Sequence, residues 1–528
     1  MEFFLLSDLF KLNSRQIQCN MKTIGSLFTF FFCLSVFSQE TVMRFEIDLT
    51  QNLDTIYVSL SPSNPLAKES NVFQFPATAP GTYQTMNIGR FVSNFQAFDK
   101  KGKPLKVAFK APNQYWIEKP QKAETISYRV AETFDTKVKQ YPIYLMCGSS
   151  LEEDHALINT HTLMGYFHGF QQSPIELKVI KNEEWKEGTA LMKENDLYLA
   201  KSFDHIVDSP LLLGDLSYAD TLIANTKIEI YTYSRNDKIE SQLLLSEMSD
   251  MLDAARKFLV NLPVDRYTFL YHFEPDQPGQ TGAWEHSYSS EYVLNEEDPT
   301  PEFLSKVTDI ASHEFFHIVT PLNIHSEIIE SFNFVEPTPS IHLWLYEGVT
   351  EWASNILLYR GEVVDLESYL SNAIARKIQI DRRYFNRSWS LKKLAQESFN
   401  EEGAKQYGNI YFRGSLVAGL MDILLLDLSD GEYGLRELVL DLVEKYGKGK
   451  PISEDQFFDE LAAMTYPELR TFVSKYILES EPLPHAEYLA KIGIVYNENE
   501  GKVTLRRKKK LSEREELLFN AWSQNLSR

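Results

Sequence analysis

The sequence predicts an α+β protein of several domains: an N-terminal β-sandwich, then a mixed α/β domain, then a C-terminal helical bundle. Up to about residue 215, short runs alternate apolar and polar residues between turn clusters, the pattern of an antiparallel sandwich. After residue 300 the apolar residues recur with helical periodicity. A chain of 528 residues is long enough for two or three domains with their own cores.

Five alternating runs predict strands in the N-terminal β domain, which we place at residues 40–218. They cover residues 43–49, 55–60, 107–110, 126–130 and 175–180. In the mixed α/β domain, which we place at residues 219–360, strands at 226–233 and 267–273 bracket a helix at 238–260.

Seven later stretches predict helices. They cover residues 302–319, 343–359, 366–378, 412–428, 435–446, 453–464 and 469–477. The last five belong to a helical domain at residues 361–485, and residues 486–528 form a short tail.

The N-terminus predicts export. Residues 21–38 have a basic start, an apolar centre and a Val-x-Ser end, as in a signal peptide. Residues 1–20 precede this segment and are interpreted as a wrongly assigned start. A lipid anchor at Cys33 is the rival interpretation, but the three phenylalanines before it lack the small residues of such sites. We therefore expect a periplasmic or secreted protein.

Composition excludes some partners. A formal net charge of -21 argues against nucleic acid, which needs a clustered positive surface. Beyond the signal, no apolar stretch approaches the roughly 18 residues of a membrane helix, so we expect no membrane association after signal cleavage. Of the three cysteines only Cys147 remains in the mature chain, which excludes an internal disulfide.

The segment Ser312-His-Glu-Phe-Phe-His317 lies within a predicted helix. Residues four apart share one helix face, so the imidazoles of His313 and His317 can reach a single ion. Glu314 lies beside that face, where its carboxylate can take a proton from water at the metal. The motif predicts one zinc ion per chain with Glu314 as general base. Two surface histidines on an ordinary helix would be the alternative.

Catalytic zinc takes a third protein ligand and leaves a position for water. The candidate is Glu347, separated from His317 by 29 residues, which is enough for a loop and a return onto the first helix. Glu351 follows one turn later on the same face, where it can hold a ligand histidine by its free ring nitrogen.

The His-Glu-x-x-His helix followed by Trp344-Leu-Tyr-Glu-Gly-Val-Thr350 resembles the gluzincin zinc peptidases, specifically the glycyl-aminopeptidase family. The long gap before Glu347 favours this group over the alanyl and leucyl aminopeptidases. The resemblance covers roughly residues 40–490, with Pro80-Gly-Thr-Tyr83 among the segments similar to the family's N-terminal β domain. It implies that the α/β domain at residues 219–360 is the catalytic domain and has a thermolysin-like fold.

Gly282-Ala-Trp-Glu-His286 resembles the family's Gly-Gly-Leu-Glu-His segment. The resemblance implies that Glu285 binds the free amino group of the substrate, with Gly282 and Ala283 beside it. Tyr411-Phe-Arg-Gly resembles the Tyr-x-Lys-Gly helix start, which implies that the Tyr411 hydroxyl stabilises the tetrahedral oxyanion.

Two segments depart from the family pattern. Residues 318–325 read Ile-Val-Thr-Pro-Leu-Asn-Ile-His where the family often has Leu-Trp-Asn-Val-Lys-Arg, so the substrate contacts of that loop are open. The tail after the segment at 481–493 is too short for the complete PDZ domain that many relatives carry.

Together these features predict a zinc metallopeptidase, an aminopeptidase that removes small N-terminal residues (Gly or Ala) from peptide substrates. A zinc endopeptidase is one alternative, and a catalytically silent peptide-binding protein of the same fold is another. Intact Glu314 and Tyr411 argue against the silent form. The preferred residue, natural substrate and oligomeric state stay open.

Overall fold

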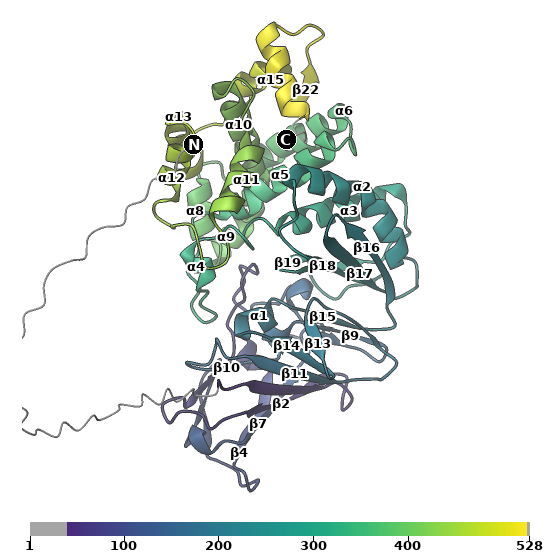
Figure 1. The fold of residues 1–528 in the computed structure, drawn as a ribbon, viewed down its shortest axis with the longest axis vertical. Coiled ribbons are helices and arrows are strands. Elements are labelled where there is room, and N and C mark those ends of the chain that lie inside the picture. Colours follow the sequence, from purple (N-terminus) through teal and green to yellow (C-terminus); the bar gives the residue numbers. More distant parts are fainter. Residues whose placement is uncertain (1–39, 525–528) are drawn as a thin grey trace, which may run out of the picture. The chain divides into compact units, whose positions relative to one another are not determined.

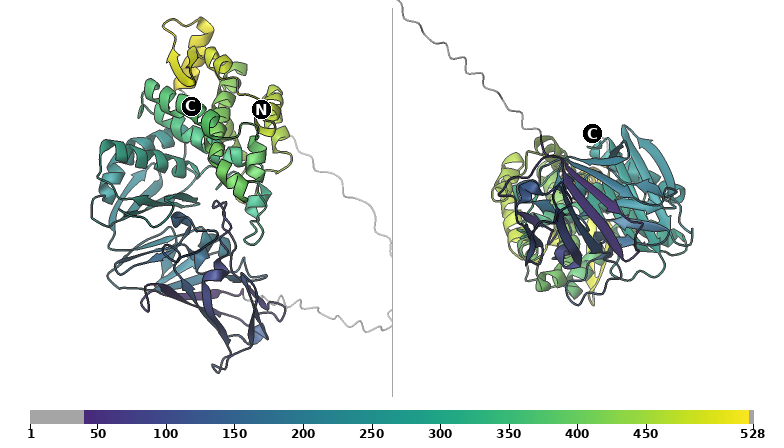
Figure 2. Two further views of the ribbon diagram at one scale, coloured as in Figure 1. Left: turned by 180° about the vertical axis from the view of Figure 1, so that it is seen from behind. Right: turned by 90° about the horizontal axis from the view of Figure 1, so that it is seen from below.

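The computed structural model describes residues 40–524, and the residues from Thr41 onward form one compact unit. The expected export signal lies outside the described residues. The predicted α+β class is confirmed: a β-rich N-terminal part leads to C-terminal helices, as the colours from purple to yellow show (Figures 1 and 2). The domain boundaries drawn from the sequence stay predictions.

The largest sheet is seven-stranded. Its order is β13 (Met192–Glu194), β14 (Leu197–Ala200), β11 (Ile175–Ile180), β1 (Met43–Asp48), β2 (Thr55–Pro62), β7 (Thr125–Ala131) and β4 (Val92–Phe98). The sequence predicted purely antiparallel pairing, which is wrong at one place: β1 and β11 are parallel. Parallel neighbours need a long crossover, and the chain between these two strands supplies it.

A second sheet has four strands: β10 (Tyr166–Phe167), β3 (Val72–Gln74), β6 (Gln114–Ile117) and β5 (Val107–Ala111). Alternate residues of the large sheet, such as Phe45 and Val58, pack with Phe73 and Phe167 of this sheet in one core. The period-2 alternation of the sequence therefore reflects one buried and one exposed face.

A third sheet of four strands joins the β-rich part to the next region. Its order is β12 (Lys186–Gly188), β15 (Leu211–Gly214), β9 (His155–Ile158) and β8 (Ser150–Leu151). Leu157 and Leu212 of this sheet share a core with Leu270 and Val293 of the following sheet.

That following sheet has five strands: β16 (Ser217–Ile223), β17 (Thr226–Ser234), β18 (Arg266–Glu274), β20 (Ser289–Asn295) and β19 (Gly282–His286). β17, β18 and β20 run parallel, and β19 is an antiparallel edge strand. Helices α2 (Ser241–Leu259) and α3 (Pro301–Phe316) pack on its other face (Figure 1). The sequence did not predict β19 or β20 as strands.

The predicted helices are present but differ at their ends. Residues 343–359 form a π-helical segment, η5 (Trp344–Val349), followed by α5 (Thr350–Arg360). The others are α6 (Leu366–Ser368), η6 (Tyr369–Ala375), α7 (Arg376–Tyr384), α10 (Gly408–Leu428), α11 (Leu435–Lys445), α12 (Phe457–Met464), α13 (Glu468–Val473) and η7 (Ser474–Leu478). The short helices α8 (Leu391–Gln396) and α9 (Glu401–Gln406) were not predicted.

The predicted tail is structured. It contains α14 (His485–Lys491), the hairpin β21 (Ile494–Asn499) and β22 (Lys502–Arg507), and α15 (Glu513–Gln524), drawn in yellow in Figure 1. The remaining short helices are η1 (Ile88–Phe91), η2 (Pro120–Lys122), η3 (Leu145–Cys147), η4 (Thr160–Thr162), α1 (Phe203–Val207) and α4 (Glu327–Glu330). The sequence analysis expected no apolar stretch of the length of a membrane helix beyond the signal, which is wrong for α10. Among the described residues this helix alone is long and apolar enough to cross a membrane, and 78% of its most apolar window is buried.

Candidate metal centre and active site

Helix α3 carries the two motif histidines. The Thr300 hydroxyl accepts from the backbone N–H of Phe303 and Pro301 occupies the first turn, which starts the helix here. The helix ends at Phe316, so His313 lies in its last turn and His317 at the C-cap, still in right-handed helical conformation. Their rings therefore stay on one face, with centroids 4.9 Å apart.

Glu347 of η5 completes a group of three donors with these histidines. Its Oε2 lies 3.4 Å from His313 Nε2 and 3.6 Å from His317 Nε2. Metal bonds of ~2.0–2.1 Å at tetrahedral angles place neighbouring donor atoms about 3.3 Å apart. The two nitrogens and one carboxylate oxygen therefore fit a zinc ion, with a fourth position free for water.

The second ring nitrogen of each histidine is held from outside the donor group. His313 Nδ1 lies 2.8 Å from Glu351 Oε2, as the sequence predicted for a supporting carboxylate. His317 Nδ1 lies 2.8 Å from the carbonyl oxygen of Thr320. Donation from Nδ1 leaves the Nε2 lone pair of each ring directed at the donor group.

The Thr320 carbonyl was missed by sequence reasoning. Thr320 lies in the loop that departs from the family pattern. Every residue has a backbone carbonyl, so the sequence does not indicate that this one contacts a histidine. The same carbonyl also accepts from the hydroxyl of Thr350 at 3.3 Å. The loop thus fixes the orientation of His317.

Tyr411 reaches the metal centre because two helices cross closely. A Cβ at Gly348 of η5 would lie 2.7 Å from the Cα of Gly414 in α10, and the reverse contact is equally short. Only glycine permits this approach. Tyr411, one turn before Gly414, lies with its ring 5.5 Å from that of His313, and its hydroxyl hydrogen bonds to Glu347.

Glu314 and Glu285 also lie close to His317. Each of these three residues has one potential ligand atom that lies within 4.8 Å of those of the other two. Burial raises the pKa of Glu314 to about 7, with Glu347 and Glu351 adding to the shift and His313 opposing it. Burial also raises the pKa of Glu285 well above its usual value, and the charges of Glu347 and Glu314 add to this.

The two carboxylates nearest the histidines behave in the opposite way. Burial alone would raise the pKa of Glu347, but His317 and His313 hold it below its usual value. Burial opposes ionisation of Glu351 too, but Lys377 and His313 lower its pKa to about 2. Burial lowers the pKa of His317 to about 4, so this imidazole is neutral and available as a ligand.

An N-terminal loop touches Glu285. Gly81 has a positive φ of 78°, and a Cβ there would lie 2.6 Å from Glu285 Oε1. Tyr83 follows, and its ring lies 5.1 Å from that of Tyr407, which in turn lies 5.8 Å from the ring of Tyr411. The sequence placed Pro80-Gly-Thr-Tyr83 in the β domain only, and gave no role to Tyr83 or Tyr407 in the site.

Gly282 and Ala283 share strand β19 with Glu285. A Cβ on Gly282 would meet Met146 at 2.7 Å. Three further histidines stand apart from the donor group. His325 Nδ1 lies 2.6 Å from Pro321 O, His342 Nε2 lies 2.9 Å from Glu454 O, and His286 faces Asp208.

A separate group of His155, His272 and Glu274 also has metal-compatible spacing among the described residues. Here the ring nitrogens hydrogen bond to each other at 2.9 Å, and Arg235 already pairs with Glu274 at 2.6 Å. These contacts account for the group without an ion.

Comparisons with known proteins place the chain in a family. Residues 44–215 match the peptidase M61 N-terminal domain, and residues 306–417 match the M61 glycyl aminopeptidase domain. Together the two matches cover more than half of the 528 residues. A search among curated proteins found no match.

Two solved structures are similar in fold. An aminopeptidase N family protein from Idiomarina loihiensis is 18% identical in sequence and has a TM-score of 0.76. The match covers 86% of this chain and 79% of the Idiomarina protein. Legionella pneumophila aminopeptidase A, in complex with aspartic acid, is 14% identical with a TM-score of 0.51. This match covers 84% of the present chain and 49% of the Legionella protein. With the family matches and the site geometry, the chain belongs to the M61 glycyl aminopeptidase family and is a peptidase.

Proposed function

We propose that the protein is a zinc-dependent aminopeptidase that removes small N-terminal residues, Gly or Ala, from peptides. The observation that carries this proposal is the spacing of His313, His317 and Glu347, with Glu314 and Glu285 beside them. We further infer a thermolysin-like catalytic domain, and export to the periplasm or the exterior directed by residues 21–38.

His313, His317 and Glu347 would hold one zinc ion. When bound, zinc polarises the attacking water and the scissile carbonyl. The Glu314 carboxylate takes a proton from the attacking water and passes it to the nitrogen of the leaving amine. Its burial in the site keeps its basicity high, which suits this exchange.

Tyr411 supplies the hydroxyl for the negative charge that develops on the carbonyl oxygen. Burial raises the pKa of Tyr411 well above its usual value, and the nearby charges of Glu347 and Glu285 add to this shift. The phenol therefore stays protonated and can donate a hydrogen bond to the oxyanion.

Glu285 would set the cleavage register. Its carboxylate accepts from the ammonium group of the substrate's first residue, which separates an aminopeptidase from an endopeptidase. The close contact of the Gly81 loop with Glu285 leaves restricted room beside that first residue, which supports a preference for Gly and Ala.

A substrate panel tests this proposal. Zinc-free protein should be inactive, and adding Zn²⁺ should restore hydrolysis of glycyl and alanyl amides but not of acetylated peptides. Glu285→Gln should reduce kcat/KM for free amino termini by roughly tenfold or more, because a hydrogen bond between charged groups contributes about 1.5–3 kcal/mol. The matched control is Glu297→Gln, an exposed carboxylate beyond β20. Equal cleavage of acetylated and free peptides would exclude the aminopeptidase and leave the endopeptidase.

A further inference from the structure

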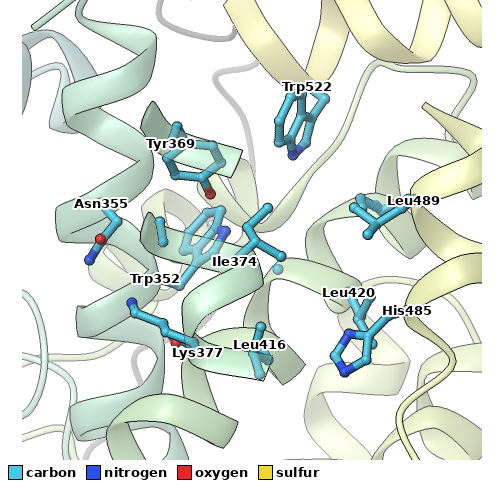
Figure 3. Close-up of a pocket in the computed structure, with 14 residues that line it drawn as sticks. Trp352, Asn355, Tyr369, Ile374, Lys377, Leu416, Leu420, His485, Leu489 and Trp522 are labelled. Carbon is cyan, nitrogen blue, oxygen red and sulfur yellow. The ribbon is translucent and has the colours of Figure 1, made fainter. Parts of the chain in front are cut away.

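Lys377 of α7 is a buried lysine behind the donor group. Its side chain is 7% exposed, and lysine is almost never buried unless paired. It lines a small cavity of about 30 Å³ whose other walls are mainly apolar, including Trp352, Leu416 and Leu489. Figure 3 shows Lys377 on the Asn355 side of this cavity, opposite His485 and Leu489.

The ammonium group of Lys377 has one ion pair among the described residues. Nζ lies 2.5 Å from Oε1 of Glu351, which also receives a hydrogen bond from the amide of Asn355 at 3.2 Å. The other oxygen of the same carboxylate, Oε2, lies 2.8 Å from Nδ1 of His313. A continuous chain of contacts therefore runs from Lys377 through Glu351 to His313.

In this geometry the two oxygens of the Glu351 carboxylate have different partners. A carboxylate with one oxygen free can rotate about its terminal bond, because that torsion is broad. Here Lys377 and Asn355 hold Oε1, so Oε2 stays directed at the histidine. The mainly apolar lining of the cavity keeps the local dielectric low on the ammonium side, which strengthens the ion pair.

We propose that Lys377 is a positioning residue of the metal centre: it orients Glu351, which fixes the ring of His313 as a zinc ligand. The proposal rests on the proposed zinc site. Groups that orient a ligand histidine from behind typically contribute 10–100-fold to metal affinity, and Lys377 would act one contact further out, through Glu351 alone.

Zn²⁺ affinity tests this directly, measured on the full mature chain by competition with a chromophoric chelator. Lys377→Met should weaken Zn²⁺ binding roughly 10-fold or more, and Lys377→Arg should restore most of the loss because it keeps the charge. In a double-mutant cycle with Glu351→Gln, the losses of Zn²⁺ affinity from the two substitutions should be strongly non-additive. The double variant should bind Zn²⁺ about as tightly as Glu351→Gln alone.

A matched control separates positioning from general loss of packing. Leu489→Ala enlarges the same cavity from the opposite wall without touching Glu351. It should lower the unfolding temperature of the zinc-free protein and leave Zn²⁺ affinity unchanged. In Co²⁺-substituted protein, Lys377→Met should shift the visible absorption band as the ring of His313 turns, and Leu489→Ala should not.

The outcomes are distinguishable from failure of the proposed function. If the unaltered protein binds no Zn²⁺, the proposed function falls. If it binds Zn²⁺ and Lys377→Met binds equally well, the positioning role of Lys377 is wrong and the zinc site stands. The positioning role would also be overturned if the losses of Zn²⁺ affinity in the cycle were additive, or if Leu489→Ala weakened Zn²⁺ binding as much as Lys377→Met. Should Lys377→Met fail to fold, Lys377→Gln takes its place in the same comparison.

Discussion

Four buried or half-buried carboxylates surround the two motif histidines, and their surroundings separate them into two pairs. The pKa values of Glu347 and Glu351 are lowered by the neighbouring histidines and, for Glu351, by Lys377, against the effect of burial. Those of Glu314 and Glu285 are raised by burial and by their acidic neighbours. Such a division within one site assigns different tasks to chemically similar groups. The first pair suits holding a cation and its ligand, and the second suits proton transfer and contact with the substrate.

Removal of the Tyr411 hydroxyl tests the oxyanion contact. Tyr411→Phe should lower kcat by about 10²–10³-fold, as expected when one donor to an oxyanion is lost, with little change in KM. Steady-state kinetics on an alanyl amide measure this. Tyr384→Phe, an exposed tyrosine at the end of α7, is the control and should behave as the unaltered protein. A kcat for Tyr411→Phe within twofold of that protein would show that the hydroxyl has no such role.

At the scale of elements, the crossing of η5 and α10 assembles the site. Gly348 and Gly414 let the two backbones meet, and the crossing sets Glu347 beside Tyr411. π-Helical turns are frequent at functional sites, and here the widened turn carries Glu347 itself.

Gly348→Ala tests this crossing. The added Cβ would lie 2.7 Å from the Cα of Gly414, so η5 and α10 must separate, at a cost of about 1–3 kcal/mol. We expect a lower unfolding temperature together with loss of Zn²⁺ binding and activity. Gly419→Ala, also in α10, meets nothing closer than 3.5 Å and should be neutral or stabilising by up to about 1 kcal/mol. If Gly348→Ala kept full activity and zinc, the close approach would not matter to the site.

The sequence predicted the site better than the elements that assemble it. His313, Glu314 and His317 could be predicted because helical spacing places side chains on one face. Glu347 could be predicted because catalytic zinc needs a third protein ligand, and Glu351 because it follows Glu347 by one helical turn. The structure brings these residues close together, and their roles stay predictions. Tyr411 and Glu285 depended on the family resemblance alone. The Thr320 carbonyl and the approach of Tyr83 could not be predicted, because a backbone atom and a long-range loop contact leave no local pattern.

The same limit applies to the fold. The strands at 43–49 and 175–180 were predicted individually, but their parallel pairing depends on the path of the chain between them. The edge strand β19 was missed because Gly282-Ala-Trp-Glu-His is too short and too rich in small residues to show alternation.

At the scale of the whole molecule, the C-terminal helix α15 closes the helical core. Trp522 is 2% exposed, and its carbonyl oxygen accepts from Nε of Arg360 at 2.9 Å. Arg360 also pairs with Asp422 at 2.8 Å, both side chains being fully buried. One buried guanidinium thus joins α5, α10 and α15.

Trp522→Ala should therefore destabilise the molecule by about 3–5 kcal/mol, the usual range for a buried tryptophan. Leu517→Ala, on the same helix but 47% exposed, is the control and should shift the free energy of unfolding by about 0.5 kcal/mol or less. Chemical denaturation measures both. Equal stability of the two variants would show that α15 is not part of the cooperative unit.

The active site also draws on distant parts of the chain. The loop after His317 reaches the β-rich part, where Phe334 O accepts from the backbone N–H of Ala77 at 2.7 Å. Ala77 lies just before the Gly81 loop that contacts Glu285. This contact therefore joins the loop between His317 and Glu347 to the segment that leads to Gly81.

The most direct test of the zinc peptidase mechanism is metal content and turnover measured together on Glu314→Gln. The substitution removes the base but no zinc ligand, so zinc should stay near one ion per chain while kcat for an alanyl amide falls by roughly 10²–10⁴-fold. Retained turnover with zinc bound would contradict the role of Glu314. Absence of zinc from both the variant and the unaltered protein would contradict the metal centre itself.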